Sequence, residues 1–255
     1  MINGIRTYHG VGKVDNVSAG WPNETDYVMQ RARVKPGEEV LPPLVFVHGA
    51  GALTDAHFED FPLTVKLWFE LAKYFTVIVT DMGGSLWGSF AHQGYIERAR
   101  LYLNNTMGCS GPVTLVGVSM GGGAIMAYAR NGAYASNVRA VAGIVPLTSL
   151  NSLKNLNPAF QVSIDAAYSG AGGYTDATSG ANHSPVIFGN HANWANTPTK
   201  LFYSSNDTTT TPADQAILTT ARPQTMTQMI GLNGHSDASV GDSIPGVVEF
   251  CRYLR

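Results

Sequence analysis

The sequence predicts a single α/β domain over residues 1–255, built on a mainly parallel, doubly wound sheet of about eight strands with a cap or lid insertion. Three observations lead to this fold class. Apolar runs of strand length alternate with amphipathic stretches of helix length. The middle runs are continuously apolar and rich in β-branched residues, which is typical of parallel strands buried on both faces. Hydrophobic residues make up 44% of the 255 residues and charged residues 13%, so the chain can bury a sizeable core and is not disordered.

The expected strands and helices follow in order along the chain. Residues 1–26 match no recognisable pattern and are expected to form a leading arm or hairpin. Strand-like segments lie at 27–34, 44–47, 75–80, 113–118, 139–146, 200–205 and 225–231. Helix-like segments lie at 61–73, 93–106, 120–131, 212–221 and 243–254. Three prolines lie near expected helix starts, where the absent amide hydrogen costs least, namely Pro62, Pro212 and Pro245.

One long segment, residues 147–199, interrupts the alternation of strands and helices. It is rich in Gly, Ala, Ser, Asn and aromatic residues, and its formally charged residues are Lys154, Asp165 and Asp176. A loop of this length within a compact domain is usually functional. We therefore expect a cap or lid that carries substrate-binding residues, with Tyr168 and Trp194 among them. An irregular surface insertion with short helices is the alternative.

The composition also excludes several classes of protein. A formal net charge of −2 gives no basic surface for nucleic acid. No stretch reaches the roughly 18–20 apolar residues of a membrane helix, and the N-terminus lacks the apolar segment of a signal peptide. The low charge is compatible with an extracellular or virion-associated protein, and the compartment is left open. Cys109 and Cys251 are too few for a disulfide framework or a metal site, although one bridge between them is compatible with the sequence.

The sharpest motif is Gly117-Val118-Ser119-Met120-Gly121, which follows a strand-like run and opens a helix of small residues. In a Gly-x-Ser-x-Gly turn of this kind the serine hydroxyl is lifted above the edge of the sheet. Glycines are needed on either side because side chains there would strike the neighbouring strand and helix. The pattern alone is weak, but its place between strand and helix indicates a nucleophilic Ser119.

A serine nucleophile needs a general base, and the base needs a group that orients it. Of the seven histidines, only His235 follows the last expected strand and precedes the C-terminal helix, at the same sheet edge as Ser119. Asp207 follows the preceding strand and reaches that edge as well. Asp237 is too close to His235 along the chain, and Asp214 should lie within a helix. We therefore predict a Ser119–Asp207–His235 triad, with a turn-capping role as the alternative for Asp207.

Two backbone amides are expected to stabilise the negative charge that develops on the substrate oxygen. One is the amide of Met120, which follows the nucleophile at a helix N-terminus. The other is the amide of Ala50 in the sequence His48-Gly49-Ala50-Gly51, which follows the strand at 44–47 and whose glycines allow close approach to a substrate. We expect the His48 imidazole to order this loop by hydrogen bonding rather than to transfer protons.

Together these motifs resemble the α/β-hydrolase superfamily. The matching segments are Val47-His48-Gly49-Ala50-Gly51, Asp81-Met82-Gly83-Gly84-Ser85, Gly117-Val118-Ser119-Met120-Gly121, Asp207 and Gly234-His235. The resemblance implies Ser119 as nucleophile, Asp207 as acid, His235 as base, the Ala50 and Met120 amides as the oxyanion hole, and 147–199 as the cap after the sixth strand. The segment that begins at Asp81 departs from the family's Asp-x-x-Gly-x-Gly-x-Ser loop, so Trp87 is expected to line the substrate pocket.

The activity expected from these residues is hydrolysis of carboxylic esters through an acyl-enzyme intermediate, as in carboxylesterases and lipases, with no cofactor and no metal. The charge-poor insertion favours a neutral or apolar small-molecule or lipid-like ester. Other chemistry on the same fold remains open: lactone or amide hydrolysis, C–C bond hydrolysis, cyanohydrin cleavage or perhydrolysis. A non-catalytic binding module is a further alternative, which the presence of all three triad residue types argues against.

Overall fold

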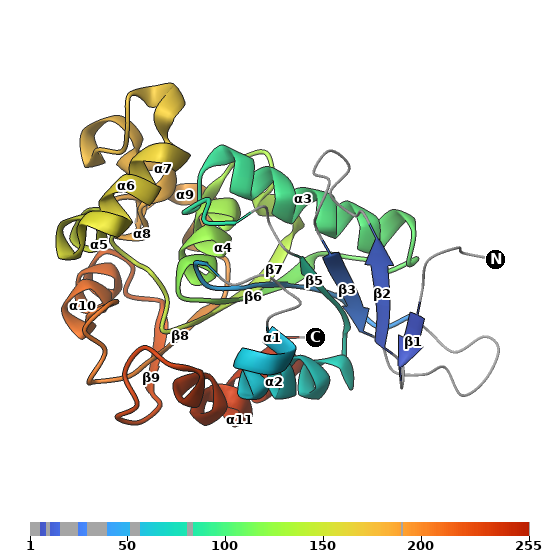
Figure 1. The fold of residues 1–255 in the computed structure, drawn as a ribbon. Helices are drawn as coiled ribbons and strands as arrows, with labels where there is room; N and C mark the ends of the chain where they lie inside the picture. Colours follow the sequence, from blue (N-terminus) through green and yellow to red (C-terminus); the bar gives the residue numbers. More distant parts are fainter. Residues whose placement is uncertain are drawn as a thin grey trace.

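A computed structural model shows the fold of the chain (Figure 1). It describes residues 6–8, 11–15, 25–29, 40–51, 57–80, 84–189 and 191–254. The described strands form one nine-stranded sheet in the order β1-β2-β3-β5-β4-β6-β7-β8-β9. Their bounds are Arg6–Tyr8 (β1), Val11–Asp15 (β2), Thr25–Met29 (β3), Pro43–Val47 (β4), Thr76–Thr80 (β5), Val113–Val118 (β6), Val138–Ile144 (β7), Thr199–Tyr203 (β8) and Met226–Met229 (β9).

Parallel pairing joins β5, β4, β6, β7, β8 and β9, while β1, β2 and β3 extend the sheet by antiparallel pairing. The predicted fold class is thus confirmed, with nine strands in place of about eight. The additional strands β1 and β2 come from the N-terminal segment for which the sequence offered only an arm or a hairpin. They pair with each other and continue into β3.

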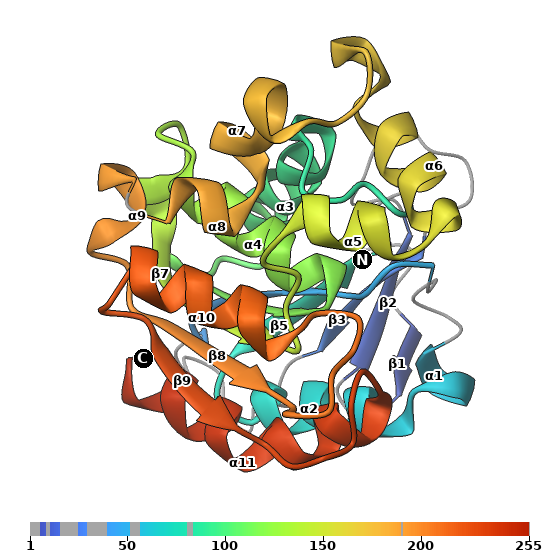
Figure 2. The same ribbon diagram turned by 90° about the vertical axis from the view of Figure 1, so that its left-hand side faces the viewer.

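Helices cover both faces of the sheet, α3 and α4 on one face and α2 and α11 on the other (Figures 1 and 2). The helices outside the insertion are His57–Asp60 (α1), Pro62–Ala72 (α2), Phe90–Asn105 (α3), Met120–Arg130 (α4), Pro212–Ala221 (α10) and Asp237–Tyr253 (α11), with a short 3₁₀ turn at Ala135–Asn137. None of the described helices is both long enough and apolar enough to cross a bilayer.

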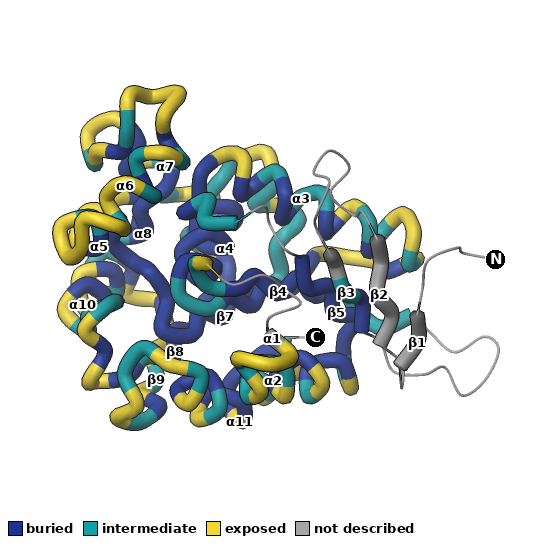
Figure 3. Tube along the Cα trace, in the orientation of Figure 1, coloured by how far each residue is buried: buried dark blue, intermediate teal, exposed yellow. Residues whose placement is uncertain are grey.

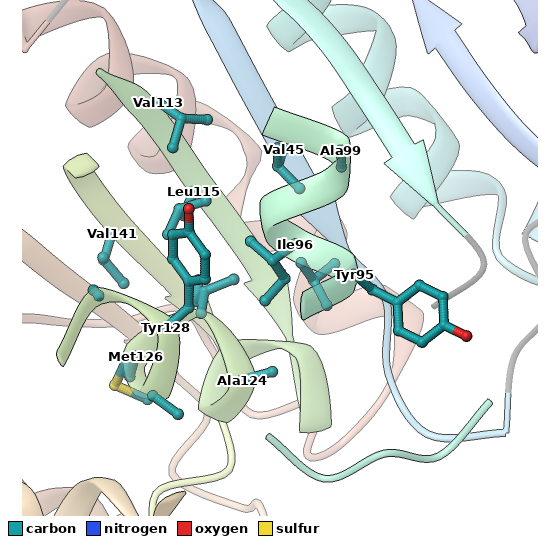
Figure 4. Close-up of a cluster of buried hydrophobic side chains, with 14 of the residues drawn as sticks. Val45, Tyr95, Ile96, Ala99, Val113, Leu115, Ala124, Met126, Tyr128 and Val141 are labelled. Carbon is teal, nitrogen blue, oxygen red and sulfur yellow. The ribbon is translucent and has the colours of Figure 1, made fainter. Parts of the chain in front are cut away.

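Successive side chains of the central strands point to opposite faces, so the sheet divides the core into two clusters. In β4, Val45 and Val47 pack beneath α3 and α4, whereas Leu44 and Phe46 pack against α2 and α11. Figure 4 shows part of the first cluster, and Figure 3 shows the buried strands between helices with exposed outer surfaces. Burial on both faces explains why the middle strands are apolar throughout rather than alternating.

The C-terminal helix begins earlier than the sequence predicts. The expected start was residue 243, near Pro245, but α11 starts at Asp237 and contains Pro245 in its interior. Two apolar side chains, Val240 and Ile244, are one helical turn apart and both pack into the second core cluster. Because this packing stabilises the first two turns, the helix tolerates the amide hydrogen that Pro245 lacks.

The insertion between β7 and β8 folds into short helices: Leu150–Leu156 (α5), Pro158–Ala167 (α6), Ala181–His183 (α7), Pro185–Phe188 (α8) and Ala192–Ala195 (α9), with a 3₁₀ turn at Ser169–Ala171 and a π-helical turn at Asp176–Gly180. An ion pair of 2.6 Å between Lys154 Nζ and Asp165 Oδ1 joins α5 to α6. The Ser152 hydroxyl donates to Asp214 Oδ1 at 2.8 Å, which ties α5 to the first turn of α10. Side chains therefore fix α5 both to α6 and to the body of the domain.

The two cysteines are not joined by a disulfide, which settles the pairing that the sequence left open. Both are buried, but Cys109 belongs to the cluster beneath α3 and α4 and Cys251 to the cluster beneath α2 and α11. The sheet separates them. Burial raises the pKa of the Cys251 thiol to about 12, so this group stays protonated and behaves as a small apolar side chain.

Candidate active site

Ser119 occupies a strained turn between β6 and α4. Its backbone has φ 53° and ψ −118°, in a region that residues with a Cβ atom rarely adopt. Two hydrogen bonds to the end of β7 hold this conformation: the Ser119 amide donates to the Ile144 carbonyl at 3.0 Å, and the Leu147 amide donates to the Ser119 carbonyl at 2.8 Å. These two hydrogen bonds compensate for the unfavourable backbone conformation of Ser119.

Glycine is required on both sides of Ser119 because the backbone of neighbouring elements passes there. A Cβ atom on Gly121 would overlap the carbonyl groups of Val47 and His48, and one on Gly117 would lie 2.6 Å from the Gly121 carbonyl carbon. These contacts are with main-chain atoms, which cannot move aside as a flexible side chain can. The spacing of the motif thus has a direct steric cause.

The structure brings Ser119, His235 and Asp207 into one hydrogen-bonded chain. Nε2 of His235 lies 2.7 Å from Oγ of Ser119, and Nδ1 lies 2.9 Å from Oδ2 of Asp207. The three residues follow β6, β9 and β8, and their side chains meet although 116 positions separate the serine from the histidine. The imidazole is placed to take the serine proton at one nitrogen while the carboxylate orients the other.

Asp207 is almost fully buried and its carboxylate has four donors. The backbone amides of Thr209 and Thr210 both donate to Oδ1 at 2.8 Å, while the Thr210 hydroxyl and His235 Nδ1 approach Oδ2. Burial opposes ionisation, but the hydrogen bonds from His235 and Thr210 outweigh it and hold the pKa of the carboxyl below its ordinary value. The group is therefore an anion at neutral pH.

Both residues whose amides are predicted to form the oxyanion hole lie near Ser119: Met120 follows it directly, and Ala50 lines the same cavity. Met120 is the first residue of α4, where backbone amides have no partner within the helix. Ala50 lines the cavity in front of Ser119. The preceding residue, Gly49, lies close to Ser119: a Cβ atom on Gly49 would be 3.4 Å from the Cβ atom of Ser119. The loop is ordered by the Gly51 amide, which donates to the Ser85 hydroxyl at 3.1 Å.

His48 is fully buried behind this loop, where its Nδ1 lies 2.6 Å from the Gly49 carbonyl oxygen. This contact agrees with the expected ordering role. Of the related segment 81–85, only Gly84 and Ser85 are within the described residues.

A cavity of about 240 Å³ opens in front of Ser119. Its lining is mostly apolar and consists of Gly49, Ala50, Phe61, Thr64, Trp87, Val118, Ser119, Val145, Leu153, Phe160, Thr209, His235, Ser236, Asp237 and Val240. Leu153 and Phe160 come from α5 and α6, so the insertion supplies part of the wall. Within the described chain, the non-glycine residues with positive φ are Trp87, Ser119 and Val145, and all three line this cavity. The strained backbone positions of the described residues therefore cluster around the cavity in front of Ser119.

Of the three residues expected to bind substrate, Trp87 lines the cavity and the other two do not. The Trp87 ring packs edge-on against Phe160, with 5.8 Å between centroids, and its Nε1 donates to the Ser163 hydroxyl at 2.8 Å. Tyr168 lies behind Trp87 and donates its hydroxyl hydrogen to the Trp87 carbonyl at 2.9 Å. It supports the wall without facing the cavity.

Trp194 corrects the sequence prediction most clearly. It is fully buried in the core cluster beneath α3 and α4, stacked under the guanidinium of Arg222 at 4.3 Å, with its Nε1 bonded to the Thr199 hydroxyl. The sequence pattern of a charge-poor segment does not distinguish an aromatic residue that faces a ligand from one that packs in the core. We therefore leave Trp194 and Tyr168 out of the proposed substrate-binding set.

Both rival acids have structural partners: Asp214 lies within α10, where it accepts the hydrogen bond from Ser152, and Asp237 caps another helix. Asp237 accepts hydrogen bonds of 2.9 Å from the amides of Leu63 and Thr64, and one of 2.7 Å from the Thr64 hydroxyl. It thereby caps the N-terminus of α2, whose own cap residue, Phe61, has no side-chain acceptor. No local pattern could have indicated this cap, because 174 positions separate Asp237 from Leu63.

Thr210 is the second residue that sequence reasoning missed. Its hydroxyl lies 2.7 Å from Oδ2 of Asp207, and its amide bonds Oδ1 of the same carboxylate. A threonine three residues after an aspartate is a familiar turn pattern, so a local signal existed. Its proximity to the triad did not follow from that pattern.

Buried polar groups of α3 hold the loop that carries Trp87. Nδ1 of His92 accepts the Gly88 amide hydrogen at 3.1 Å, and the Gln93 side chain donates to the Gly88 carbonyl at 3.0 Å. Burial of His92, with the nearby His48 as the smaller cause, lowers the pKa of its imidazole to about 3. His92 is thus neutral in the folded protein at neutral and mildly acidic pH.

Stability is therefore expected to fall in mild acid through His92. Between about pH 6.5 and pH 3 the unfolded chain binds a proton at this residue and the folded chain does not, so acid favours unfolding. From pH 7 to pH 5 the loss should be about 2 kcal/mol. His92→Asn keeps an acceptor for the Gly88 amide but does not titrate, and urea unfolding at both pH values should show a loss smaller by about this amount. An unchanged pH dependence would contradict the burial of a neutral imidazole.

Within the described part of the chain, no group of three or more His, Cys, Asp or Glu side chains is arranged to hold a metal ion.

Comparisons with known proteins agree with this architecture. Residues 42–229, more than half of the chain, match the model of the alpha/beta hydrolase fold family. A search of curated protein sequences finds no match. Among solved structures, an S-formylglutathione hydrolase from Agrobacterium tumefaciens is similar with a TM-score of 0.65 at 13% identity, covering 98% of both chains.

Two further structures share the fold. A ferulic acid esterase has a TM-score of 0.67 at 13% identity, covering 91% of this chain and 92% of its own. Carboxyl esterase 2 from the mycorrhizal fungus Tuber melanosporum has a TM-score of 0.66 at 13% identity, covering 100% and 89%. At such identities the likeness concerns the fold. With the family match over residues 42–229, the chain belongs to the alpha/beta hydrolase fold family.

Proposed function

We propose that this protein is a serine hydrolase that cleaves carboxylic esters through an acyl-enzyme intermediate. The observation that carries the proposal is the continuous hydrogen-bonded chain from Ser119 through His235 to the buried Asp207, which opens into an apolar cavity. The esterases among the structural neighbours support the same class of reaction.

In the proposed mechanism the Ser119 hydroxyl transfers its proton to Nε2 of His235 and its oxygen attacks the ester carbonyl carbon. Asp207 stabilises the imidazolium that forms. The backbone amides of Ala50 and Met120 donate to the negatively charged oxygen of the tetrahedral intermediate. His235 then returns the proton to the leaving alcohol as the C–O bond breaks. A water molecule, deprotonated by His235, attacks the carbonyl carbon of the acyl-enzyme. His235 then returns this proton to the Ser119 oxygen as its bond to the acyl carbon breaks, which releases the acid and restores the free serine.

The cavity favours a neutral ester. Apart from His235, the ionisable residue in its lining is Asp237, whose carboxylate is already engaged by the amides of α2. No lysine or arginine lines the described cavity, so a carboxylate or phosphate on the substrate would find no cation there. Trp87, Phe160 and Leu153 offer contacts to an aryl or aliphatic group. We propose that α5 and α6 act as the cap of the site, as expected for residues 147–199.

The experiment that tests the proposal is covalent labelling with a fluorophosphonate, followed by mass spectrometry of the modified peptide. Ser119 should carry the label, because its hydroxyl is the one activated by the imidazole. Ser236 lines the same cavity, but its hydroxyl donates to the Asn233 carbonyl at 2.9 Å. Ser236→Ala should therefore still be labelled, whereas Ser119→Ala should not. Folded protein that resists the reagent would indicate a binding module instead.

A panel of substrates distinguishes ester hydrolysis from its alternatives. Neutral p-nitrophenyl esters of increasing chain length should be turned over with higher kcat/KM than lactones or anilides, because discrimination appears in that ratio. Esters that bear a free carboxylate near the acyl group should be poorer than their methyl-capped counterparts. Equal or better turnover of the charged substrates would contradict the proposed neutral site.

A further inference from the structure

Thr210 lies where three parts of the proposed active site meet. Its side chain is almost fully buried. Its Oγ1 is 2.7 Å from Oδ2 of Asp207, 3.1 Å from the carbonyl oxygen of Val145 and 3.4 Å from Nδ1 of His235. Thr210 is not among the residues that line the described cavity, so its side chain is not placed to contact a substrate there.

The carboxylate of Asp207 has two differently held oxygens. Backbone amides donate to Oδ1, whereas Oδ2 faces His235 and the Thr210 hydroxyl. The terminal torsion of an aspartate side chain is soft, since its preferred angles are broad. With a donor on each oxygen the plane of the carboxylate is fixed, and the oxygen presented to His235 is the one that the hydroxyl also contacts. Removing the hydroxyl would leave Oδ2 held by His235 alone, the very group that the carboxylate has to orient.

The same hydroxyl contacts the turn that supports the nucleophile. Val145 has φ 38°, a strained value for a β-branched residue, and its carbonyl faces Thr210. The residue before it, Ile144, accepts the Ser119 amide hydrogen. A hydroxyl carries one proton, and the shorter contact to a charged acceptor takes the larger share of it. The Thr210 hydroxyl therefore acts mainly on Asp207.

We propose that Thr210 is a positioning residue of the triad, whose hydroxyl fixes the Asp207 carboxylate in the orientation that His235 requires. This inference rests on the proposed serine hydrolase function. It extends the site by a side chain that never touches the substrate but acts on the reaction through Asp207.

The test compares substitutions at Thr210 in a p-nitrophenyl ester assay. Thr210→Val has nearly the same shape and lacks the hydroxyl, so kcat should fall about 10–100-fold while KM changes by less than about threefold. Thr210→Ser restores the hydroxyl and should recover kcat to within about threefold of the parent. Thr208→Val makes the same chemical change at an exposed position of the same loop and should leave both constants unchanged. Circular dichroism checks that each variant is folded; Thr210→Ala replaces Thr210→Val if the latter does not fold.

A double-mutant cycle separates positioning from a general structural role. In the Asp207→Ala background the hydroxyl has no carboxylate to orient, so Thr210→Val should cause no further loss of kcat. The proposal is overturned if Thr210→Val keeps full kcat, if the serine variant fails to recover it, or if the loss persists without Asp207. An active Ser119→Ala would overturn the proposed function together with this inference. An inactive Ser119→Ala beside a fully active Thr210→Val would overturn the positioning role alone.

Discussion

Replacing Ser119 with alanine is expected to lower kcat for p-nitrophenyl esters by about 10⁴-fold or more. The substitution removes the oxygen that would form the acyl-enzyme bond. Among the described residues, the hydroxyl of Ser119 is the one that lies within hydrogen-bonding distance of Nε2 of His235. The cavity and the proposed oxyanion amides remain, so a small residual rate above that of water is compatible with the proposed mechanism.

The fold of this variant should be unaffected. The hydrogen bonds that hold Ser119 to the end of β7 are made by its backbone, and alanine keeps both. Thermal unfolding should therefore give a Tm within about 2 °C of the parent. Ser110→Ala, at an exposed position outside the cavity, is the matched control and should keep full activity. Retained activity in folded Ser119→Ala would refute the nucleophile assignment.

Gly121→Ala is expected to have the largest effect on the fold of the site. The added methyl group would overlap the carbonyls of Val47 and His48, which belong to the end of β4 and the loop that carries Ala50, whose amide is proposed for the oxyanion hole. Relief requires α4 to move away from β4, and this costs about 2–4 kcal/mol with loss of close packing. Tm should fall by about 5–12 °C, and kcat should fall with it because the loop and the serine turn separate.

Gly94→Ala is a control variant that is expected to raise the stability rather than lower it. Gly94 lies inside α3, and nothing is within 4 Å of the Cβ that alanine would add. Alanine in a helix interior loses less conformational freedom on folding than glycine, so stability should rise by about 0.5–1 kcal/mol. Differential scanning calorimetry of Gly121→Ala and Gly94→Ala should show a lower Tm for the first variant and a higher Tm for the second. A Gly121→Ala protein as stable and active as Gly94→Ala would show that the steric reading of the motif is wrong.

The fold could be predicted because its signals are local. The strands β4, β5 and β6 are buried on both faces, so each appears as an unbroken apolar run whatever its neighbours are. The serine turn is set by glycines within two positions of Ser119. Placing Asp207 and His235 near it needed only the rule that the carboxyl ends of parallel strands meet at one edge.

The sequence alone thus determined the fold class, the order of strands and helices, and which chemistry-bearing residues reach the same edge of the sheet. Tertiary structure decided how side chains far apart in the chain are used. It assigned Asp237 to the cap of α2, placed Trp194 in the core, started α11 at Asp237 rather than at residue 243, and placed the Thr210 hydroxyl between Asp207 and Val145. The physical reason is that periodicity and turn chemistry depend on neighbouring residues, whereas the partner of a carboxylate, hydroxyl or aromatic ring depends on which distant backbone packs beside it.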